Sequence, residues 1–159
     1  MWQRILVPHD FSPSANHAAA LARDEAKSHG GEILLLHVVD LPIAYGPDTA
    51  LIVSGPNNTA PVGMREYALR SAKEHLQDLA LRIGADGVAV STFVIVGRPV
   101  DEIVKFAGEH EVDVIVMGTH GRTGIRHLFA GSVAERVVRS SRVPVMTIRE
   151  RDEPRAAAR

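Results

Sequence analysis

The sequence predicts an α/β protein with a single doubly wound, five-stranded parallel sheet that carries helices on both faces. Strand-like and helix-like segments alternate five times along the chain. The strand-like segments are short runs rich in valine, isoleucine and leucine, which is typical of parallel strands that are buried on both faces. With 159 residues, of which 45% are hydrophobic, the chain is long enough for one domain with a proper core.

The first two strands and the helix between them are marked by their composition. Residues 5–7 and 33–39 contain apolar runs that predict the first and second strands. Ser12 and Pro13 suit the N-cap and the first position of a helix, and Gly30 suits its end. One face of that helix carries small side chains that would let it lie close to the sheet, namely Ala15, Ala18, Ala19, Ala22 and Ala26.

Residues 65–83 carry the clearest helical pattern. Apolar side chains recur there at spacings of three and four residues, at Leu69, Ala72, Leu76, Leu79 and Ile83. Residues 88–96 then predict the third strand. Pro99 begins a further helix, whose inner face would carry Val100, Ile103, Val104 and Ala107.

The C-terminal part repeats the alternation once more. Residues 112–117 form a β-branched run that predicts the fourth strand. The sequence from Ser132 to Glu135 has the form of a capping box and predicts the start of the last helix. From this helix we expect three apolar side chains to face inward, Ala134, Val137 and Val138. Residues 143–148 predict the final strand.

Two segments fall outside this alternation. Residues 40–63 contain four prolines and three glycines and show no period, which is typical of a functional lid or a disordered insertion. We expect partial disorder there, in a segment that would cover the ligand or a partner subunit. Residues 151–159 predict a solvated C-terminal tail, so the domain is expected to span residues 1–150.

The composition argues against several classes of protein. A net charge of −1 and a pI near 6.7 argue against nucleic-acid binding through bulk charge. The absence of cysteine excludes disulfides and thiol chemistry. No apolar stretch approaches the ~18 residues that a membrane helix needs, and the first residues lack the layout of a signal peptide. We therefore expect a cytoplasmic protein without a membrane partner.

The most informative motif is the glycine-rich loop over residues 118–132, between the fourth strand and the last helix. Two residues separate Gly118 from Gly121, nine separate Gly121 from Gly131, and Ser132 follows. Free backbone N–H groups in such a loop, with a helix dipole behind them, predict a phosphate-binding site. The spacing matches neither the dinucleotide fingerprint Gly-x-Gly-x-x-Gly nor the phosphate loop Gly-x4-Gly-Lys-Ser/Thr.

This loop resembles that of the universal stress protein family, in its ATP-binding branch. The resemblance extends over residues 3–149 and is carried in order by residues 5–12, 37–40, 112–121, 131–135 and 143–145. It implies an adenine nucleotide alpha hydrolase-like fold of the Rossmann-like kind, with strand order 3-2-1-4-5. In that order the first and fourth strands are neighbours, so that residues 8–10 and 118–122 converge on one crevice.

The resemblance also implies which residues line the nucleotide pocket. These are Pro8, Asp10, Val38, Met117, Gly118, Gly121, Gly131, Ser132 and Val133, to which we add Thr119, His120 and Arg122 of the same loop. Asp10 would contact the base or ribose, because its charge would repel phosphates, and Val38 would pack against adenine. The glycines and the N–H groups of Ser132 and Val133 suit the triphosphate, and Arg122 and Arg126 would add positive charge.

Simpler structural roles stay open for several of these residues. In the alternative interpretation, Asp10 does no more than accept backbone N–H hydrogen bonds at the start of the next helix, and Ser132 does no more than cap the last helix. Loop arginines are more often simply solvated. We assign no role to His9, and we expect His17, His29, His75 and His110 to lie on exposed faces without a special role.

Other chemistries fit the sequence poorly. His120 and His127 share a loop that has no carboxylate at ligand spacing, which argues against a zinc site. The residues around Ser132 do not form the Gly-x-Ser-x-Gly elbow of a serine hydrolase. A flavin or nicotinamide enzyme would need a glycine fingerprint that is missing here.

The resemblance favours an ATP-binding universal stress protein whose occupancy acts as a signal. Hydrolysis should be at most slow, because the loop offers phosphate donors but no evident general base and no catalytic residue. Mg²⁺ would arrive with ATP and be held through the phosphates. The alternative is a protein-interaction module of the same fold with a weak or empty pocket.

The final strand predicts the assembly. Pro144 cannot donate a backbone hydrogen bond, so it marks residues 143–148 as an edge strand. An apolar edge strand needs a cover, and a twofold-related copy of the same strand is one way to provide it. Because members of the family commonly dimerise through this element, the resemblance implies a homodimer.

Overall fold

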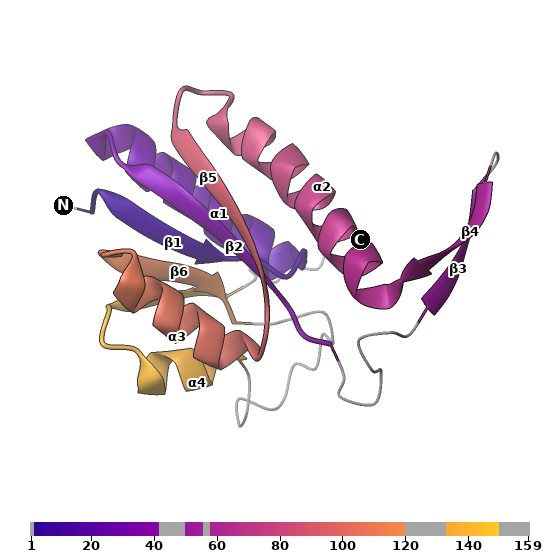
Figure 1. Ribbon diagram of the computed structural model, residues 1–159. Helices are drawn as coiled ribbons and strands as arrows, with labels where there is room; N and C mark the ends of the chain where they lie inside the picture. Colours follow the sequence, from indigo (N-terminus) through magenta and orange to yellow (C-terminus); the bar gives the residue numbers. More distant parts are fainter. Residues whose placement is uncertain (1, 42–49, 56–57, 120–132, 150–159) are drawn as a thin grey trace, which may run out of the picture.

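The computed structural model describes residues 2–41, 50–55, 58–119 and 133–149, with the side chains of all of these except 50–62. Figure 1 shows the helices and strands, which follow one another as β1 (Arg4–Pro8), α1 (Pro13–His29), β2 (Glu32–Val39), β3 (Ala50–Gly55), β4 (Asn58–Gly63), α2 (Met64–Gly84), β5 (Ala89–Val96), α3 (Pro99–Glu109), β6 (Val114–Gly118), α4 (Val133–Ser140) and β7 (Val145–Ile148). Within the part of the chain that the structure describes, none of these helices is long and apolar enough to cross a membrane.

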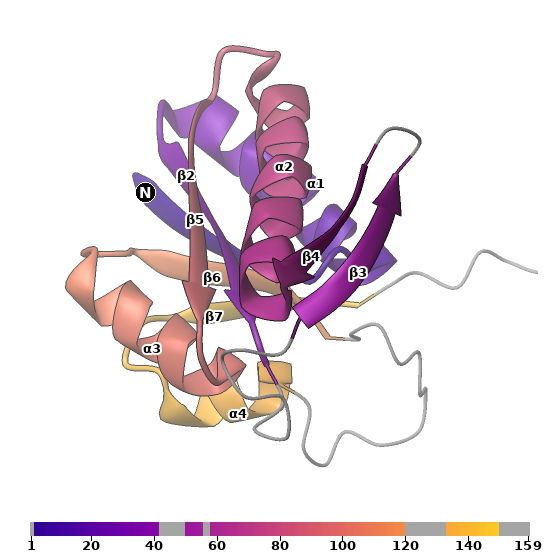
Figure 2. The same ribbon diagram turned by 45° about the vertical axis from the view of Figure 1, so that its right-hand side comes forward.

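Five of the strands form one parallel sheet in the order β5-β2-β1-β6-β7. This confirms the expected order 3-2-1-4-5, because these are the third, second, first, fourth and fifth strands of that sheet along the chain. Helices α1 and α2 cover one face, and α3 and α4 cover the other (Figures 1 and 2). From β1 the chain builds outward on one side and later returns to the other, so the topological switch point lies between β1 and β6.

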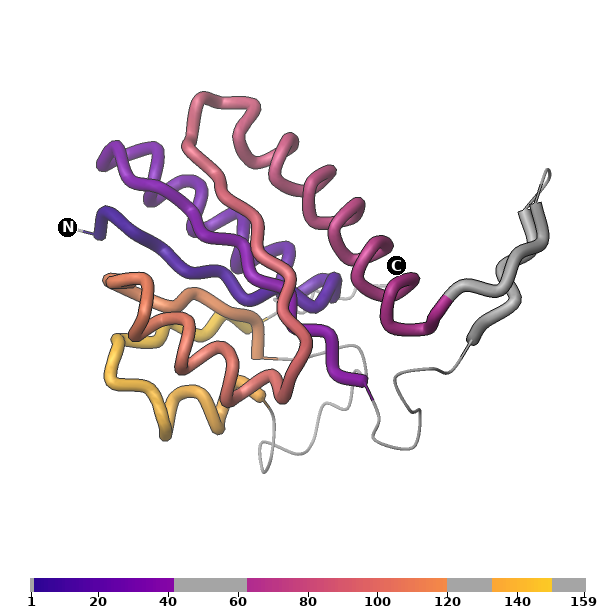
Figure 3. The backbone as a smooth tube through the Cα atoms, in the orientation of Figure 1, coloured from indigo at the N-terminus to yellow at the C-terminus, as the bar shows by residue number. Residues whose placement is uncertain are grey.

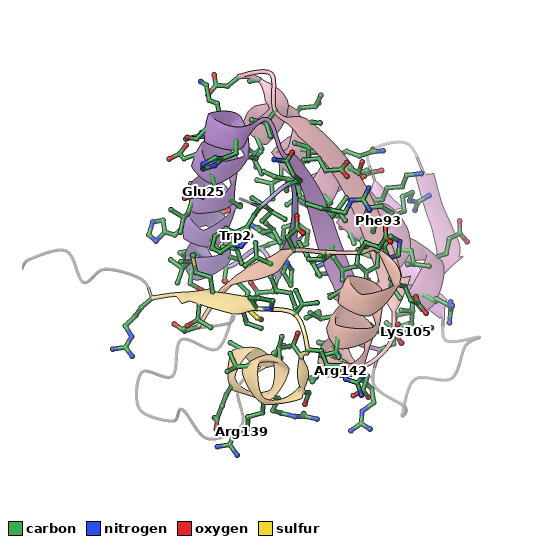
Figure 4. The ribbon with its side chains drawn as sticks, turned by 90° about the vertical axis from the view of Figure 1, so that its left-hand side faces the viewer. Trp2, Glu25, Phe93, Lys105, Arg139 and Arg142 are labelled. Carbon is green, nitrogen blue, oxygen red and sulfur yellow. The ribbon has the colours of Figure 1, made fainter. Side chains whose placement is uncertain are left out.

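Successive residues of the central strand β1 enter the two layers of the core in turn. Ile5 and Val7 pack in the layer beneath α1 and α2, whereas Leu6 packs with Phe106 and the rest of the layer beneath α3 and α4. These strand residues are fully buried, as expected of a central strand in a parallel sheet. Figure 4 shows the side chains that fill the space between sheet and helices, with Arg139 at the outer surface of α4.

Helix α1 begins and ends as its sequence predicts. The Ser12 side chain accepts a hydrogen bond from the backbone N–H of Ala15 at 3.2 Å, and Pro13 lies in the first turn. Gly30 ends the helix at a φ of 67°, a left-handed conformation that glycine adopts without steric cost. The predicted alanine face is buried against the sheet at Ala15, Ala18, Ala19, Ala22 and Ala26.

The expectation for the inner face of the last helix is wrong at one position. Val138 is 49% exposed, and α4 buries only Ala134 and Val137. Each residue of an α-helix is rotated by about 100° from the one before it, so Val138 turns away from the sheet when Val137 points directly into it. The apolar stripe that α4 buries is therefore narrower than its sequence indicates.

The expectation of a structureless segment over residues 40–63 is also wrong for its second half. Strands β3 and β4 form an antiparallel pair whose register runs from Ala50 opposite Gly63 to Gly55 opposite Asn58. The chain there has a β-prone run, Ala-Leu-Ile-Val, followed by residues that favour turns. In a pair with two open edges a proline is tolerated, which is why the proline count misled the prediction. Residues 42–49 and 56–57 lie outside the described residues.

The amino ends of the sheet strands are closed by polar contacts. The carboxylate of Asp113 accepts hydrogen bonds from the backbone N–H groups of Gln3, at 2.7 Å, and Arg4, at 2.8 Å. The Arg4 and Gln3 hydrogen bonds lower the pKa of the Asp113 carboxyl. The Arg4 guanidinium pairs with Glu32 at 2.7 Å and also donates to the carbonyl of His110 at 3.0 Å. These contacts tie β1, β2 and the start of β6 together at one end.

Candidate functional site

The carboxyl ends of β1, β2 and β6 lie side by side because β1 is paired with both of the other strands. The strands of the parallel sheet all end on the same side of the molecule (Figure 3). There β1 ends with Pro8, which is opposite Leu36 of β2, and β6 ends with Met117 and Gly118. The structure therefore brings the ends of the first and fourth sheet strands to one place, beside the switch point where ligands bind in folds of this kind.

The predicted nucleotide-binding residues divide into two groups. Those that the structure describes lie at the carboxyl ends of the strands or at the start of α4, and they are Pro8, Asp10, Val38, Met117, Gly118, Thr119 and Val133. The others, which belong to the loop expected to hold phosphates, lie outside the described residues and are His120, Gly121, Arg122, Gly131 and Ser132.

Asp10 occupies the turn between β1 and α1. Its Oδ1 accepts a hydrogen bond from the backbone N–H of Ser12 at 3.1 Å, so the simpler structural role foreseen for this residue has its geometry in place. Asp10 also lines a cleft together with Phe11, so the capping bond does not remove its side chain from the surface of the site. Phe11 has a φ of 64°, a left-handed conformation that costs a non-glycine residue about 1–3 kcal/mol and is common at functional sites.

Two residues at the end of β6 have structural roles. A Cβ atom at Gly118 would lie 2.5 Å from Oγ of Ser14 and 2.9 Å from the backbone nitrogen of Ala15. Only glycine therefore lets this strand end approach α1 so closely. Thr119 donates its backbone N–H to the carbonyl of Ile148 at 2.9 Å, which ties the end of β6 to β7. From the sequence alone, neither of these structural roles could be distinguished from a role in phosphate binding.

A cleft of about 470 Å³ lies where the ends of β1 and β2 face α2. Two carboxylates, Asp10 and Asp40, lie on the strand side, and Val38 is part of the same wall. The helix side, which the sequence analysis missed, presents a stripe of side chains spaced four residues apart: Tyr67, Ser71 and His75. In the sequence such a stripe looks like an ordinary solvated helix face, because the neighbouring residues give no sign that the ends of two strands lie opposite it.

The cleft contains two imidazoles whose tautomers the backbone fixes. Nδ1 of His37 lies 2.7 Å from the carbonyl oxygen of His9, and Nδ1 of His75 lies 2.7 Å from that of Ser71. A carbonyl oxygen only accepts, so both Nδ1 atoms carry the proton. The ring of Phe11 lies between these two histidines, with centroid distances of 4.7 Å to His37 and 5.7 Å to His75.

His9, to which the sequence assigned no role, is the buried histidine of this region. Its side chain is only 4% exposed, and Nδ1 accepts a hydrogen bond from the backbone N–H of Phe11 at 3.2 Å. Nε2 makes no hydrogen bond of good geometry with any residue that the structure describes. Burial lowers the pKa of His9 to about 4, and the nearby charge of Asp10 and the side chain of Asn16 offset only part of this effect.

The remaining histidines follow the sequence expectation with one exception. His17, His29 and His75 are exposed, whereas His110 is half-buried and stacks on Phe106 with ring centroids 3.7 Å apart. Among the described residues no three histidine, aspartate or glutamate side chains are placed to hold a metal ion. His120 and His127, considered as zinc ligands from the sequence, lie outside them.

Comparison with known proteins gives a consistent result. The sequence model of the universal stress protein family matches residues 1–149. Universal stress protein MJ0577 of Methanocaldococcus jannaschii is 30% identical over 158 residues, which cover 96% of this chain and 98% of that protein. The solved structure of MJ0577 superimposes with a TM-score of 0.76 at 28% identity and covers 96% of this chain and 99% of that one.

Two more distant structures share the fold and contain nucleotides. One is a universal stress protein in complex with cAMP, with a TM-score of 0.68 at 22% identity, covering 92% of this chain and 97% of that one. The other is the universal stress protein from Archaeoglobus fulgidus in complex with dAMP, with a TM-score of 0.63 at 23% identity, covering 93% and 98%. At these identities the likeness concerns the fold alone.

Proposed function

The chain belongs to the universal stress protein family, and from this premise we propose that it binds ATP at the carboxyl ends of β1, β2 and β6. Occupancy of this site would act as a signal in the cytoplasm, with hydrolysis at most slow. The observation that carries the proposal is the convergence of Asp10 and Val38 with Met117 and Gly118 across the central strand, beside the switch point. These residues come from distant parts of the chain.

The ligand would be divided between two kinds of surface. Asp10 and Val38 would face the base and ribose, because a carboxylate tolerates hydroxyl and amine donors but repels phosphate. The triphosphate would lie at the start of α4, where Gly131 and Ser132 directly precede Val133, and Gly121 belongs to the same glycine-rich segment of the sequence. Mg²⁺ would be bound through the phosphate oxygens.

Slow turnover follows from the composition of the loop. Fast hydrolysis would need a positioned general base that activates water next to the triphosphate. Residues 118–132 contain no aspartate or glutamate, so the loop has no carboxylate that could act as this base or orient the imidazole of His120 or His127. We expect ATP turnover far below the ~1–10³ s⁻¹ common among enzymes. Rapid phosphate release in a single turnover by highly purified protein, lost in Ser132→Ala, would identify a true ATPase instead.

The alternative function is a protein-interaction module with an empty pocket. The cAMP and dAMP complexes show that proteins of this fold can hold an adenine nucleotide, but the proposal for this chain is supported by its own residues. Mass spectrometry of the purified protein distinguishes the two functions, because a binding protein should retain a nucleotide through purification. Protein free of nucleotide that also fails to bind added ATP would favour the interaction module.

The test of the site is competition calorimetry with ATP and GTP. We expect tighter binding of ATP, and Gly131→Val should abolish that binding because a branched side chain would occupy the space where backbone and phosphate must approach. Its far-UV circular dichroism should remain close to that of the original protein. Equal or stronger binding of GTP would reject the assignment of Asp10 and Val38 to adenine, and unaltered affinity in the variant would make the loop purely structural.

We also propose a homodimer through β7, the edge strand beside β6. The carbonyls of Pro144 and Ile148 accept from β6, at Ile115 N–H and Thr119 N–H, each at 2.9 Å. Backbone groups alternate in direction along a strand, so those of Val145 and Thr147 point away from β6 toward a partner strand.

Thr147→Pro tests this assembly because it removes an outward N–H without touching the bonds to β6. Light scattering at micromolar concentration should report a shift toward monomer. Met146 is a poorer choice because its side chain packs against the core beneath α1 and α2. A monomer in the original protein, or a dimer that Thr147→Pro leaves intact, would contradict assembly through this edge.

A further inference from the structure

We infer that Tyr67, Ser71 and His75 of α2 form a wall of the proposed nucleotide site that selects a base with an exocyclic amine, as in adenine. This inference rests on the proposed function and assigns to α2 a part that the sequence did not indicate. The helix would thereby decide which nucleotide the site accepts. It is carried by the cleft between α2 and the ends of β1 and β2.

Helix α2 has two separate working faces. The first is apolar and packs against the sheet through Leu76, Leu79 and Ile83, and the buried Ala72 lies at its border with the cleft. The second consists of Tyr67, Ser71 and His75, which are spaced by four residues and therefore stand above one another on the helix surface. These three side chains line the cleft rather than the core, and Tyr67 and His75 are exposed.

The opposite wall shares residues with the proposed adenine pocket. Asp10 and Val38, which we assign to the base and ribose, line the same cleft as His75. Phe11 connects the two walls, because its ring lies 4.7 Å from His37 on the strand side and 5.7 Å from His75 on the helix side. A ligand that contacts Asp10 from within the cleft therefore lies next to α2.

The carboxylates and imidazoles of the cleft offer acceptors to a ligand, whereas the hydroxyls of Tyr67 and Ser71 can donate or accept. The carboxylates of Asp10 and Asp40 can only accept when they are ionised. Because Nδ1–H of His37 and of His75 donates to a backbone carbonyl, the neutral rings carry their lone pair on Nε2. Such a lining favours a ligand that presents donors, and it disfavours phosphate.

Adenine and hypoxanthine differ in the group that this lining would distinguish. Adenine carries an amine, which donates, at the position where hypoxanthine carries a carbonyl, which accepts. An acceptor of the protein that faces this position gains a hydrogen bond with ATP and meets a lone pair with ITP. The site should therefore prefer ATP to ITP, and His75 should contribute to that preference.

The experiment is calorimetric titration of the full chain with ATP and with ITP. His75→Phe keeps a flat ring and removes the acceptor, and Tyr67→Phe removes only the hydroxyl. The matched control is His29→Phe, because His29 is also an exposed helix histidine with Nδ1 close to the carbonyl four residues earlier, at 3.1 Å. It lies at the far end of α1, away from the cleft.

We expect His75→Phe to weaken ATP binding by about three- to tenfold, the usual effect of one lost hydrogen bond, and to leave ITP binding nearly unchanged. Tyr67→Phe should have a smaller effect in the same direction, and His29→Phe none. Equal losses for both nucleotides, or affinities that neither cleft variant changes, would overturn the inference while the proposed function stands. Failure of the original protein to bind ATP would overturn both.

Discussion

The two ends of the central sheet are built in opposite ways. At the amino ends of the strands, Asp113 accepts two backbone hydrogen bonds and Arg4 pairs with Glu32, so the polar groups there are tied to one another. At the carboxyl ends, His9 is buried with an unsatisfied nitrogen among the described residues, Phe11 has a strained backbone, and a cleft stands open. Backbone strain does not separate the two ends, because Glu111 at the amino end also has a positive φ, of 49°. What separates them is that the polar groups of the amino end are paired with one another, whereas the carboxyl end combines a buried imidazole with a cleft lined by carboxylates and histidines, as ligand sites often do.

The largest expected effect comes from His9 at the carboxyl end. The folded state keeps this ring neutral with a pKa of about 4, against 6.5 for an ordinary histidine. Between these values the unfolded chain binds more protons, so stability falls as the pH drops from 6.5 to 4, by up to about 3 kcal/mol. Urea unfolding at several pH values measures this slope.

The variant His9→Gln should lose this part of the pH dependence, because it has no group that titrates in this range. His17→Gln is the matched control, since His17 is an exposed histidine of α1 and should keep the original slope. The same slope in all three proteins would show that His9 is not the source, and that burial at this end of the sheet carries no such cost.

A smaller effect is expected at Gly118, which lies at the carboxyl end of the sheet but has a structural role. Gly118→Ala should destabilise the fold by about 2 kcal/mol, because the added methyl overlaps the backbone of α1 at Ser14 and Ala15. Gly108→Ala is the control, as a Cβ there meets nothing within 4 Å and alanine favours the helix. Denaturant unfolding that finds Gly118→Ala as stable as the original would remove the packing role.

The smallest effect is expected at Asp113, at the amino end of the sheet. Asp113→Ala should cost about 1 kcal/mol of unfolding free energy, since the backbone N–H groups of Gln3 and Arg4 lose their acceptor but regain water. ATP affinity should not change. Asp86→Ala, which removes an exposed ion pair with Lys27 at 3.5 Å, should have almost no effect on either quantity. A change in ATP affinity in Asp113→Ala would contradict the claim that the amino end stabilises the fold without taking part in ligand binding.

The fold could be predicted from the sequence because its signals are local. Ser12, Pro13 and Gly30 set the limits of α1 through caps that involve only neighbouring residues, and the inner strands β1, β2 and β6 contain buried apolar runs. The order of the strands came from the resemblance to the family, and the structure confirms it. The pair of β3 and β4 was missed because frequent proline and glycine hid its β-prone run.

The site could be predicted only where the strands themselves supply it. Asp10 and Val38 follow or end strands, so their place at the carboxyl edge follows from the topology. The stripe on α2 could not be recognised, because polar residues spaced by four on a helix are typical of a solvated face. The role of Gly118 depends on its distance from α1, and that of His9 depends on its burial in the folded chain, and neither can be inferred from the spacing of residues in the sequence.

The most direct test of the account is hydrogen–deuterium exchange with and without ATP, followed by mass spectrometry of peptides. We expect ATP to slow exchange at the carboxyl end, in peptides that contain residues 9–12, 37–40, 67–75 and 117–135. Peptides that contain Arg4, Glu32 or Asp113 at the amino end should exchange at the same rate in both conditions. Slower exchange at the amino end alone, or no change anywhere at saturating ATP, would contradict the assignment of ligand binding to the open end of the sheet.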